Sequence, residues 1–365
     1  MTDANQDGYP MDHALRLGAR GLGSTWPNPA VGCVIVQDQR IVGRGCTQPG
    51  GRPHAETMAL AQSGNAARGA SVYVTLEPCA HHGQTPPCAA ALIAAGVVRV
   101  ITALTDPDPR VAGKGHAMLR SAGIIVTEGI RADQARMAHA GFLKRVSQGL
   151  PFVTLKLATT LDGRIATASG ESRWITGGEA RRAVHALRLR HDAVMVGSGT
   201  ALADDPDLTV RDLGALRQPL RVVLDGTLRH SAHSRLGQSA RINPVWLLHT
   251  ALAPAPAREA WQATGARLIE AAGENHISAR AALEALAKEG LTRILCEGGA
   301  GLAAALVAEN LVDQLVLHSA GKLIGAEGLP AIGPLNFGSL SQASQWQRTD
   351  LRTLGNDVQT VWQRV

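Results

Sequence analysis

The sequence is poor in aromatic side chains, which make up only 3% of its 365 residues. Two tyrosines and three phenylalanines argue against the aromatic platform on which single-stranded nucleic acids stack. Apolar residues still reach 45%, so the core must be built mainly from Ala, Leu, Val and Ile. The net charge of +6 contains no block of like charges, and it suits an anionic small substrate as well as it suits nucleic acid.

Long apolar runs are also missing, since no stretch approaches the ~18 residues that a membrane-spanning helix needs. The first residues, MTDANQDGYP, are polar and unlike a signal peptide. We therefore expect a cytoplasmic protein. In that compartment cysteines are thiols or metal ligands rather than disulfides; the five are Cys33, Cys46, Cys79, Cys88 and Cys296.

The second half of the chain lacks the G-x-G-x-x-G fingerprint of the standard dinucleotide-binding fold. The runs VGSGTALADDP and CEGGAGLAAAL come close to it but do not match. The run ILCEGGAGLAAALVAENL nevertheless predicts a strand, a glycine turn and a helix, whose free backbone N–H groups suit a phosphate. A simple tight turn is the alternative interpretation.

The order of apolar segments predicts two α/β domains, as the length suggests. The first half alternates predicted strands with predicted helices; the strands are 30–36, 71–76, 97–104 and 124–127, and the helices are 11–22, 55–63, 88–95 and 115–122. A last helix at 132–147 leads into QGLP, where Gly149 and Pro151 mark a boundary. We therefore place one domain at residues 1–148 and the other at residues 149–365.

The second half restarts the alternation of strands and helices. Strands are predicted at FVTLKLA, AVMVG, LRVVLD, PVWLLH, TRILCE and DQLVLHSA, and a helix at GGEARRAVHALRLRH. Residues 278–289 predict an Ala-rich helix, and residues 251–258 predict a loop. The C-terminal run SQWQRTDLRTLGNDVQTVWQRV holds two strand-like segments around a Gly-Asn turn, which indicates an antiparallel hairpin.

Three residues with zinc-ligand chemistry stand at the ends of predicted elements. His54 opens a helix, Cys79 follows a strand, and Cys88 follows TPP at the start of another helix. A catalytic zinc takes three protein ligands and leaves one position for water. Glu56, two residues after His54, then suits a general acid and base that moves protons from this water to a leaving amine.

The spacing is close to the H-x-E and P-C-x-x-C pattern of zinc deaminases, but eight residues separate the two cysteines instead of two. The intervening run AHHGQTPP contains His81 and His82, which are rival candidates for ligands. A closed structural zinc site with His81 as fourth ligand is an alternative, although such a site has no need of Glu56. The remaining cysteines fit ordinary core thiols: Cys33, Cys46 and Cys296.

Four runs carry a family resemblance. NPAVGCVIV, GRPHAETMAL, TLEPCAHHGQTPPC and DPDPRVAGKG resemble the bifunctional riboflavin-biosynthesis deaminase/reductase family, in which a long loop separates the two cysteines. The resemblance implies a cytidine-deaminase-like three-layer fold for residues 1–148, with zinc on the histidine and the two cysteines named above. It also implies that Glu56 is the proton donor and that Asn28 and Lys114 contact the substrate.

Further runs resemble the reductase part of the same family: KLATTLDGRIA, SGESRWITG, RLRHDAVMVGSGTALADDPDLTVR and the glycine turn after Glu297. The resemblance implies a dihydrofolate-reductase-like α/β fold for residues 149–365, with NADPH as cofactor. By motif position, the residues in contact with substrate are Lys156, Ser172, Arg188, Leu208, Arg211 and Glu297. Those in contact with the cofactor are Ala158, Trp174, Thr200, Asp204, Gly299, Ala300, Gly301, Leu302, Ala303, Ala304 and Ala305.

At four positions the chain departs from the family pattern. Thr47 and Met58 stand where the pattern has histidine, Gln84 stands where it has a basic residue, and Asp108 stands where it has asparagine. Gln84 and Asp108 reduce the positive charge of loops that we expect to face the substrate phosphate. The sequence identifies no side-chain acid for the reduction.

We therefore predict a bifunctional enzyme with NADPH and one Zn²⁺ per chain. The resemblance implies deamination of 2,5-diamino-6-(5-phosphoribosylamino)pyrimidin-4(3H)-one, followed by reduction of the ribosyl chain to ribityl. The expected partners are this phosphorylated pyrimidine and further copies of the chain, as a dimer or tetramer, but neither nucleic acid nor a membrane. The alternatives are a nucleic-acid-editing zinc deaminase with an unrelated second half, and a zinc-stabilised binding module.

Overall fold

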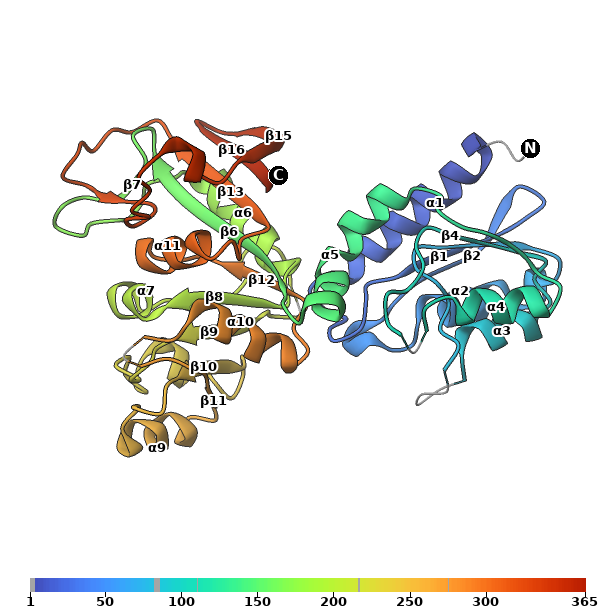
Figure 1. The fold of residues 1–365 in the computed structure, drawn as a ribbon, viewed down its shortest axis with the longest axis horizontal. Coiled ribbons are helices and arrows are strands. Elements are labelled where there is room, and N and C mark those ends of the chain that lie inside the picture. Colours follow the sequence, from blue (N-terminus) through green and yellow to red (C-terminus); the bar gives the residue numbers. More distant parts are fainter. Residues whose placement is uncertain (1–3, 82–85, 110, 216, 275) are drawn as a thin grey trace. The chain divides into compact units, whose positions relative to one another are not determined.

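The computed structural model describes residues 4–81, 86–109, 111–215, 217–274 and 276–365. The chain divides into two compact units, Met1–Gly149 and Leu150–Val365. Each unit is built on its own β-sheet with helices packed against it (Figure 1). Within the described ranges, no helix has the length and the apolar character needed to cross a membrane.

In the first unit, the described residues form one sheet between two layers of helices (Figure 1). The strand order is β2-β1-β3-β4-β5, with bounds β1 Gly32–Gln37, β2 Arg40–Cys46, β3 Ser71–Val74, β4 Arg99–Thr102 and β5 Ile125–Thr127. β1 pairs antiparallel with β2 and β3, whereas β3, β4 and β5 run parallel. One face carries α1 (Ala4–Gly18) and α5 (Ala132–Gln148), and the other carries α2 (Ala55–Ser63), α3 (Cys88–Ala95) and α4 (Lys114–Ser121). Short 3-10 turns lie at Ala19–Gly21, Pro49–Gly51 and Gly64–Ala67.

Two glycines let helices lie directly on this sheet. A Cβ atom on Gly32 of β1 would lie 1.8 Å from the carbonyl oxygen of Ala14 in α1. A Cβ atom on Gly45 of β2 would lie 2.0 Å from the carbonyl oxygen of Ala55 in α2. Real Cβ atoms essentially never approach another atom within 3.0 Å, so only glycine allows these contacts. Gly45 thereby sets the position of the first turn of α2.

The second unit contains a mixed sheet in the order β11-β10-β9-β8-β12-β6-β13-β16-β15. The strands from β11 to β13 are parallel, and β16 and β15 add an antiparallel edge. The strand bounds are β6 Phe152–Thr160, β8 Ala193–Gly197, β9 Leu220–Leu224, β10 Val245–His249, β11 Arg267–Glu270, β12 Arg293–Cys296, β13 Gln314–Ala320, β15 Trp346–Leu354 and β16 Asp357–Arg364. A separate small pair consists of β7 (Arg164–Ala166) and β14 (Leu329–Pro330). The helices are α6 Gly178–Leu189, α7 Ser198–Asp204, α8 Arg235–Gln238, α9 Ala255–Ala263, α10 Ala279–Lys288 and α11 Ala300–Ala308, and a 3-10 turn lies at Leu340–Gln342.

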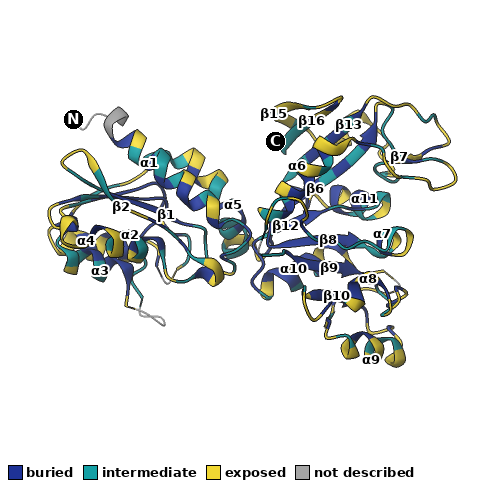
Figure 2. Cartoon of the chain, turned by 180° about the vertical axis from the view of Figure 1, so that it is seen from behind, coloured by how far each residue is buried: buried dark blue, intermediate teal, exposed yellow. Residues whose placement is uncertain are grey.

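The central strands of this sheet are buried along almost their whole length, as the dark blue ribbons of Figure 2 show. Parallel strands covered on both faces read as continuous apolar runs, which explains segments such as AVMVG and VWLLH. Within one core cluster, Val194, Val223 and Leu247 pack together with Trp261 of α9. The Trp261 indole N–H donates to the carbonyl oxygen of His230 at 3.0 Å, so this large side chain is buried without leaving its polar atom unsatisfied.

The structure confirms the α/β class and most predicted elements, including the C-terminal hairpin and the helices at 55–63 and 88–95. The helix predicted at 11–22 was misplaced: it spans Ala4–Gly18 and includes Pro10, whose breaker character hid the true start. The loop predicted at 251–258 was wrong in its second part, because α9 begins at Ala255, and proline suits a helix start. β2 was not predicted, since its sequence RIVGRGC shows no clear alternation.

We expect Gly45→Ala to destabilise the protein, because the added methyl group must push α2 away from β2. Overpacking of this kind typically costs about 1–3 kcal/mol. Thermal unfolding of the full-length chain should show a lower Tm. Gly321→Ala is the control, since a Cβ atom there meets no atom within 4 Å. An unchanged Tm for Gly45→Ala would show that α2 tolerates displacement from the sheet.

Candidate active sites

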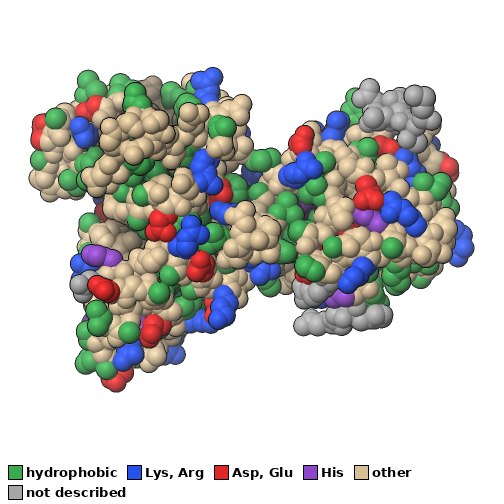
Figure 3. Space-filling view, in the orientation of Figure 1, with side chains coloured by type: hydrophobic (Ala, Val, Ile, Leu, Met, Phe, Trp, Pro, Cys, Tyr) green, Lys and Arg blue, Asp and Glu red, His purple; other side chains and the backbone are tan. Residues whose placement is uncertain are grey.

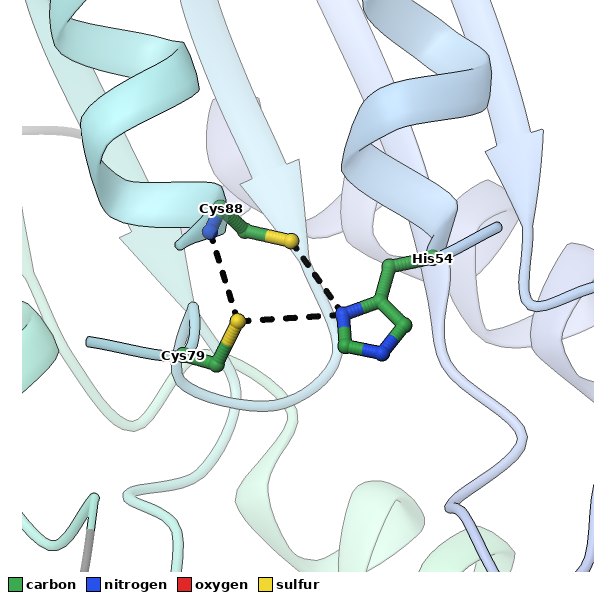
Figure 4. Close-up of side chains that lie close together, drawn as sticks. All are labelled: His54, Cys79 and Cys88. Carbon is green, nitrogen blue, oxygen red and sulfur yellow. Dashed lines mark hydrogen bonds between the residues drawn. The ribbon is translucent and has the colours of Figure 1, made fainter. Parts of the chain in front are cut away.

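His54, Cys79 and Cys88 converge in the first unit, as Figure 4 shows. His54 is the extended residue before α2, Cys88 is the first residue of α3, and Cys79 lies in the turn after β3. Their ligand atoms all lie within 4.8 Å of one another. The Nδ1 atom of His54 is 3.3 Å from Cys88 Sγ and 3.7 Å from Cys79 Sγ.

These distances fit a tetrahedral zinc ion. With zinc bonds of ~2.0–2.3 Å to nitrogen and sulfur, neighbouring donors of a tetrahedron lie roughly 3.3–3.8 Å apart. One imidazole and two thiols also form a donor set that zinc prefers and that leaves a fourth position open. The three residues therefore fit this metal.

Hydrogen bonds favour a thiolate at Cys79. The Cys88 thiol lowers the pKa of Cys79 to about 4; burial opposes this, and His54 and the Cys88 backbone N–H support it. That N–H donates to Cys79 Sγ at 3.3 Å. The pKa of Cys88 is raised instead, by the same thiol pair first and by burial second. A thiolate is the form in which cysteine binds a metal.

Glu56 lies in the first turn of α2, two residues after His54, and is only 4% exposed. Burial is the main cause that raises the pKa of Glu56 to about 7, and the negative charge of Cys79 contributes. A carboxyl group with a pKa near neutrality can both accept and donate a proton at physiological pH. Among the described residues, the cluster of ligand atoms comprises His54 and the two cysteines, without Glu56.

The rival ligands do not join this cluster within the described residues. His81 follows Cys79 closely, and its buried Nδ1 atom has no hydrogen-bond partner. His82 lies outside the described residues, as does Gln84. All five cysteines are free; Cys33 and Cys296 are buried and Cys46 is partly buried. Cys33 belongs to the hydrophobic core cluster of the first unit, Cys46 packs against that cluster, and Cys296 is fully buried, which agrees with the interpretation of the three as core thiols.

Asn28 and Lys114 are the two substrate contacts that the resemblance implies for the first unit. The Asn28 side chain lies over Gly51, where an added Cβ atom would be 1.9 Å from Asn28 Nδ2. Lys114 is the exposed first residue of α4, and its Nζ atom donates to the carbonyl oxygen of Pro109 at 3.1 Å. Thr47, which replaces a histidine of the family pattern, is buried and accepts from the Val31 N–H at 3.0 Å.

Sequence analysis missed one buried carboxylate beside this cluster. Glu77 is 4% exposed and accepts four backbone N–H groups, from Asp106, Gly113, Gly115 and His116. The signal was a charged residue in the otherwise apolar run VYVTLEPC, which a strand pattern alone does not explain.

A second candidate site lies in the second unit, at the end of β12. Glu297 follows this strand and forms a bidentate ion pair with Arg188 of α6. Arg188 Nε donates to Glu297 Oε1 at 2.5 Å, and Arg188 Nη2 donates to Glu297 Oε2 at 2.8 Å. Arg188 also donates to the carbonyl oxygen of Thr209 at 2.6 Å. Burial alone would raise the pKa of Glu297, but Arg188 and then Lys156 outweigh it and bring that pKa to about 2.

Lys156 on β6 reaches the same level of the sheet as Glu297. Its neighbour Leu155 is paired with Cys296, the last residue of β12, so Lys156 and Glu297 both come one step beyond that pair. Burial lowers the pKa of Lys156, while the charge of Glu297 works against this shift. A partly buried ammonium group beside a carboxylate–guanidinium pair is suited to hold polar oxygens of a ligand.

Thr200 and Gly299 follow two neighbouring strands, β8 and β12, between which the strand order changes direction. After β8 the chain continues to β9 on one side of this point. After β12 it continues to β13 on the other side, beyond β6. Ligands of open parallel sheets bind outside the carboxyl ends of strands at such a point. Thr200, after β8, donates to the carbonyl oxygen of Gly298, after β12, at 3.3 Å.

The glycine turn after Glu297 leaves room that a side chain would fill. Gly299 has φ +86°, and an added Cβ atom would lie 2.8 Å from Thr200 Oγ1. Gly299 directly precedes α11, whose first residues span the predicted segment from Ala300 to Ala305. Free N–H groups at the start of this helix suit a phosphate, so the turn fits a dinucleotide such as NADPH.

The remaining predicted contacts lie on several segments of the second unit. Trp174 is 60% exposed, and the guanidinium of Arg181 lies 4.6 Å from its ring centre. The carbonyl oxygen of Asp204, at the end of α7, accepts from Arg173 at 2.8 Å. Leu208 is buried with φ +55°. Arg211 Nη1 lies 3.7 Å from an Asp207 carboxylate oxygen. The remaining two are Ala158 on β6 and Ser172 in the segment before α6.

Comparison with known proteins relates both units to one family. The RibD C-terminal domain matches residues 151–360, and the cytidine and deoxycytidylate deaminase zinc-binding region matches residues 4–104. Riboflavin biosynthesis protein RibD of Escherichia coli K12 is 44% identical over 367 residues, covering 97% of this chain and 98% of that protein. The homologue from Aquifex aeolicus is 37% identical, with 97% of each chain covered.

Solved structures agree with this relation. Acinetobacter baumannii RibD superimposes with a TM-score of 0.89 at 39% identity, and the match covers 100% of both chains. A diaminohydroxyphosphoribosylaminopyrimidine deaminase/5-amino-6-(5-phosphoribosylamino)uracil reductase from Thermotoga maritima superimposes with a TM-score of 0.86 at 31% identity, over 99% of both chains. The fold expected for each half is thus confirmed.

We expect Cys79→Ser to lose most of its zinc, since a hydroxyl group is a far weaker zinc ligand than a thiolate. Elemental analysis of the purified chain measures this directly. Cys46→Ser is the matched control, because Cys46 lies on β2 outside the cluster and should leave the zinc content unchanged. Full zinc retention in Cys79→Ser would transfer the ligand role to another residue, such as His81.

Proposed function

The chain belongs to the RibD family of riboflavin-biosynthesis proteins, and from that premise we propose which of its residues carry the two reactions. The protein is a bifunctional enzyme, a zinc-dependent deaminase and an NADPH-dependent reductase. We assign deamination to residues 1–148 and reduction to residues 149–365, an assignment that the two matched spans support. The substrate is the diaminopyrimidinone ribosylamino-phosphate that the Thermotoga maritima relative is named for.

One observation carries the deaminase assignment: the donor cluster lies beside a buried carboxyl group that is not one of its members. We assign zinc to His54, Cys79 and Cys88. When bound, zinc supplies a Lewis acid that makes water nucleophilic at neutral pH, and NADPH supplies the hydrogen and the two electrons of the reduction. Glu56 accepts the proton of the attacking water and delivers a proton to the leaving amine.

The rest of the deaminase site orients the substrate. Asn28 is held over Gly51, three residues before His54, so its amide lies on the segment that leads to the cluster. Lys114 presents an exposed ammonium group at the start of α4, which suits a phosphorylated substrate. Thr47 does not replace the histidine of the family pattern functionally, because its hydroxyl group is bonded to the Val31 backbone.

In the reductase site, the Arg188–Glu297 ion pair provides polar groups in fixed positions at the end of β12. Glu297 and the carbonyl oxygen of Thr209 accept three hydrogen bonds from Arg188, which holds the guanidinium in place and leaves N–H groups for a ligand. Lys156 then offers its ammonium group to an oxygen of the opened ribosyl chain. Thr200 and the segment from Gly299 to Ala305 receive the cofactor, and Gly299 gives it close access to the backbone.

Two further features belong to the same proposal. A cytoplasmic location agrees with the five free cysteines, because two of them act as zinc ligands and must stay reduced. Assembly into a dimer or tetramer is expected from the family resemblance, and sedimentation equilibrium of the full-length chain measures it.

The two alternatives are not favoured. On the face that Figure 3 shows, Lys and Arg side chains are interspersed with Asp and Glu, whereas a nucleic-acid path requires a basic stripe. The match of residues 151–360 to the RibD C-terminal domain opposes an unrelated second half. A binding module without catalysis gives no reason to bury Glu56 beside the cluster.

We expect Glu56→Gln to abolish deamination while zinc is retained, because the amide keeps the size of the side chain but cannot carry protons. General acid–base groups typically contribute ~10²- to 10⁴-fold, so ammonia release should fall by at least that range. NADPH oxidation with substrate that is already deaminated should be nearly unchanged and serves as the internal control. Near-normal ammonia release with zinc in place would remove Glu56 from the mechanism.

We expect Gly299→Ala to weaken NADPH binding by ~10-fold or more, because the added Cβ atom would lie 2.8 Å from Thr200 Oγ1 and displace the turn that receives the cofactor. Titration of the full-length chain with NADPH, followed by fluorescence or calorimetry, measures the dissociation constant. Gly298→Ala is the matched control: its φ is also positive, at +53°, but an added Cβ atom meets nothing within 4 Å. Equal effects of both substitutions would mean that backbone strain, rather than the cofactor path, explains the loss.

A further inference from the structure

Glu77 is a buried carboxylate for which the zinc and proton chemistry has no use. Its side chain has 0% exposure, and it lies two residues before Cys79. An unsatisfied charge in such a place would be strongly unfavourable, so the contacts of Glu77 must compensate for its burial. It is therefore a candidate for a role that depends on its two oxygens.

Each carboxylate oxygen of Glu77 accepts two hydrogen bonds from backbone N–H groups of α4 and the segment that leads into it. Oε1 accepts the N–H groups of Gly115 and His116 at 2.9 and 3.2 Å. Oε2 accepts those of Gly113 and Asp106 at 2.9 and 3.1 Å. Three of these four donors flank or follow Lys114 directly in the chain.

These bonds replace a cap that α4 lacks. Its N-cap residue is Gly113, in the left-handed conformation and without a side chain to bond the first N–H groups. Glu77 supplies the missing acceptor from a distant part of the sequence, and its negative charge also suits the positive end of the helix. The position at which α4 begins, and with it the position of Lys114, therefore depends on Glu77.

A second contact ties the same helix start to the turn that carries Cys79. An added Cβ atom on Gly115 would lie 2.0 Å from the carbonyl oxygen of Pro78, so only glycine allows this approach. Pro78 stands between Glu77 and Cys79. The hydrogen bonds of Glu77 and the close packing of Gly115 on Pro78 thus both place the first turn of α4 against the turn that carries Cys79.

We propose that Glu77 is a positioning residue of the deaminase site. Glu77 fixes Lys114 relative to the Cys79 turn, so that Lys114 binds the phosphorylated substrate while that substrate lies over the zinc. This inference rests on the proposed function, in which Lys114 contacts the substrate. Glu77 does not touch the reacting atoms and acts through the backbone around Lys114.

Glu77→Gln in the full-length chain tests the first contact, because glutamine has one accepting oxygen and its NH₂ group would face two N–H donors. We expect the KM of deamination to rise at least ~10-fold, which is the effect of losing one hydrogen bond to a charged group. Zinc should stay at one per chain, and NADPH oxidation with deaminated substrate should be unchanged. Glu128→Gln is the matched control, since Glu128 is a partly exposed glutamate that bonds Arg120 and also lies beside His116.

Gly115→Ala tests the packing of the helix start while it keeps the Glu77 side chain chemically intact, although the added Cβ atom would also lie 3.1 Å from Glu77 Oε1. Its methyl group should push the start of α4 from Pro78 and produce the same rise in KM with zinc retained. It also keeps the inference testable if Glu77→Gln does not fold.

A double-mutant cycle with Lys114→Met separates positioning from general damage. If Glu77 acts through Lys114, then Glu77→Gln should raise KM by less than ~2-fold in the Lys114→Met background. A full, additive rise there would overturn the inference while leaving the role of Lys114 intact. A Lys114→Met variant with normal KM would instead remove the proposed substrate contact, and the inference with it. Zinc loss in both Glu77→Gln and Gly115→Ala would assign Glu77 to the metal site alone.

Discussion

Both sites depend on one constraint, which is that neighbouring parallel strands end at the same edge of a sheet. In the first unit, β3 leads to Glu77 and Cys79, and its parallel neighbour β4 leads to Asp106. In the second unit, β8 leads to Thr200 and β12 leads to Glu297 and Gly298. Residues far apart in the sequence are brought within hydrogen-bond distance because the ladder of backbone bonds fixes where each strand ends.

In the deaminase half, the first residues of helices join the residues at the strand ends to complete the site. His54 precedes α2 and Cys88 begins α3, so two helix N-termini point their first residues toward the Cys79 turn. Helix N-termini stabilise negative charge, which agrees with the lowered pKa of Cys79 and with the carboxylate of Glu77 at the start of α4. The close packing of α2 on β2, which Gly45 permits, then holds His54 and Glu56 in place.

The buried charges of the two halves are stabilised in different ways. Glu77 is surrounded by backbone N–H groups, whereas Glu297 is paired with the guanidinium of Arg188. For Glu56, the charge of His54 and the hydrogen bonds from its own backbone N–H and from the Cys88 thiol compensate only in part, so burial still raises the pKa to about 7. Several donors fix the positions of Glu77 and Glu297, whereas Glu56, with a pKa near neutrality, can change its protonation state as acid–base catalysis requires.

The sequence by itself determined the α/β class, most strands, and the helices that begin at Ala55 and Cys88, because these depend on local periodicity and on proline and glycine signals. It also identified His54, Cys79 and Cys88 as one group, since their residue types and spacing limit the chemistry. Only the tertiary structure decided that Glu77 binds the start of α4, that Arg188 is held by Glu297, and that Thr47 bonds the Val31 backbone. These contacts join segments 16 to 109 residues apart, and their partners are chosen by strand order and helix packing, which no local pattern of side chains encodes.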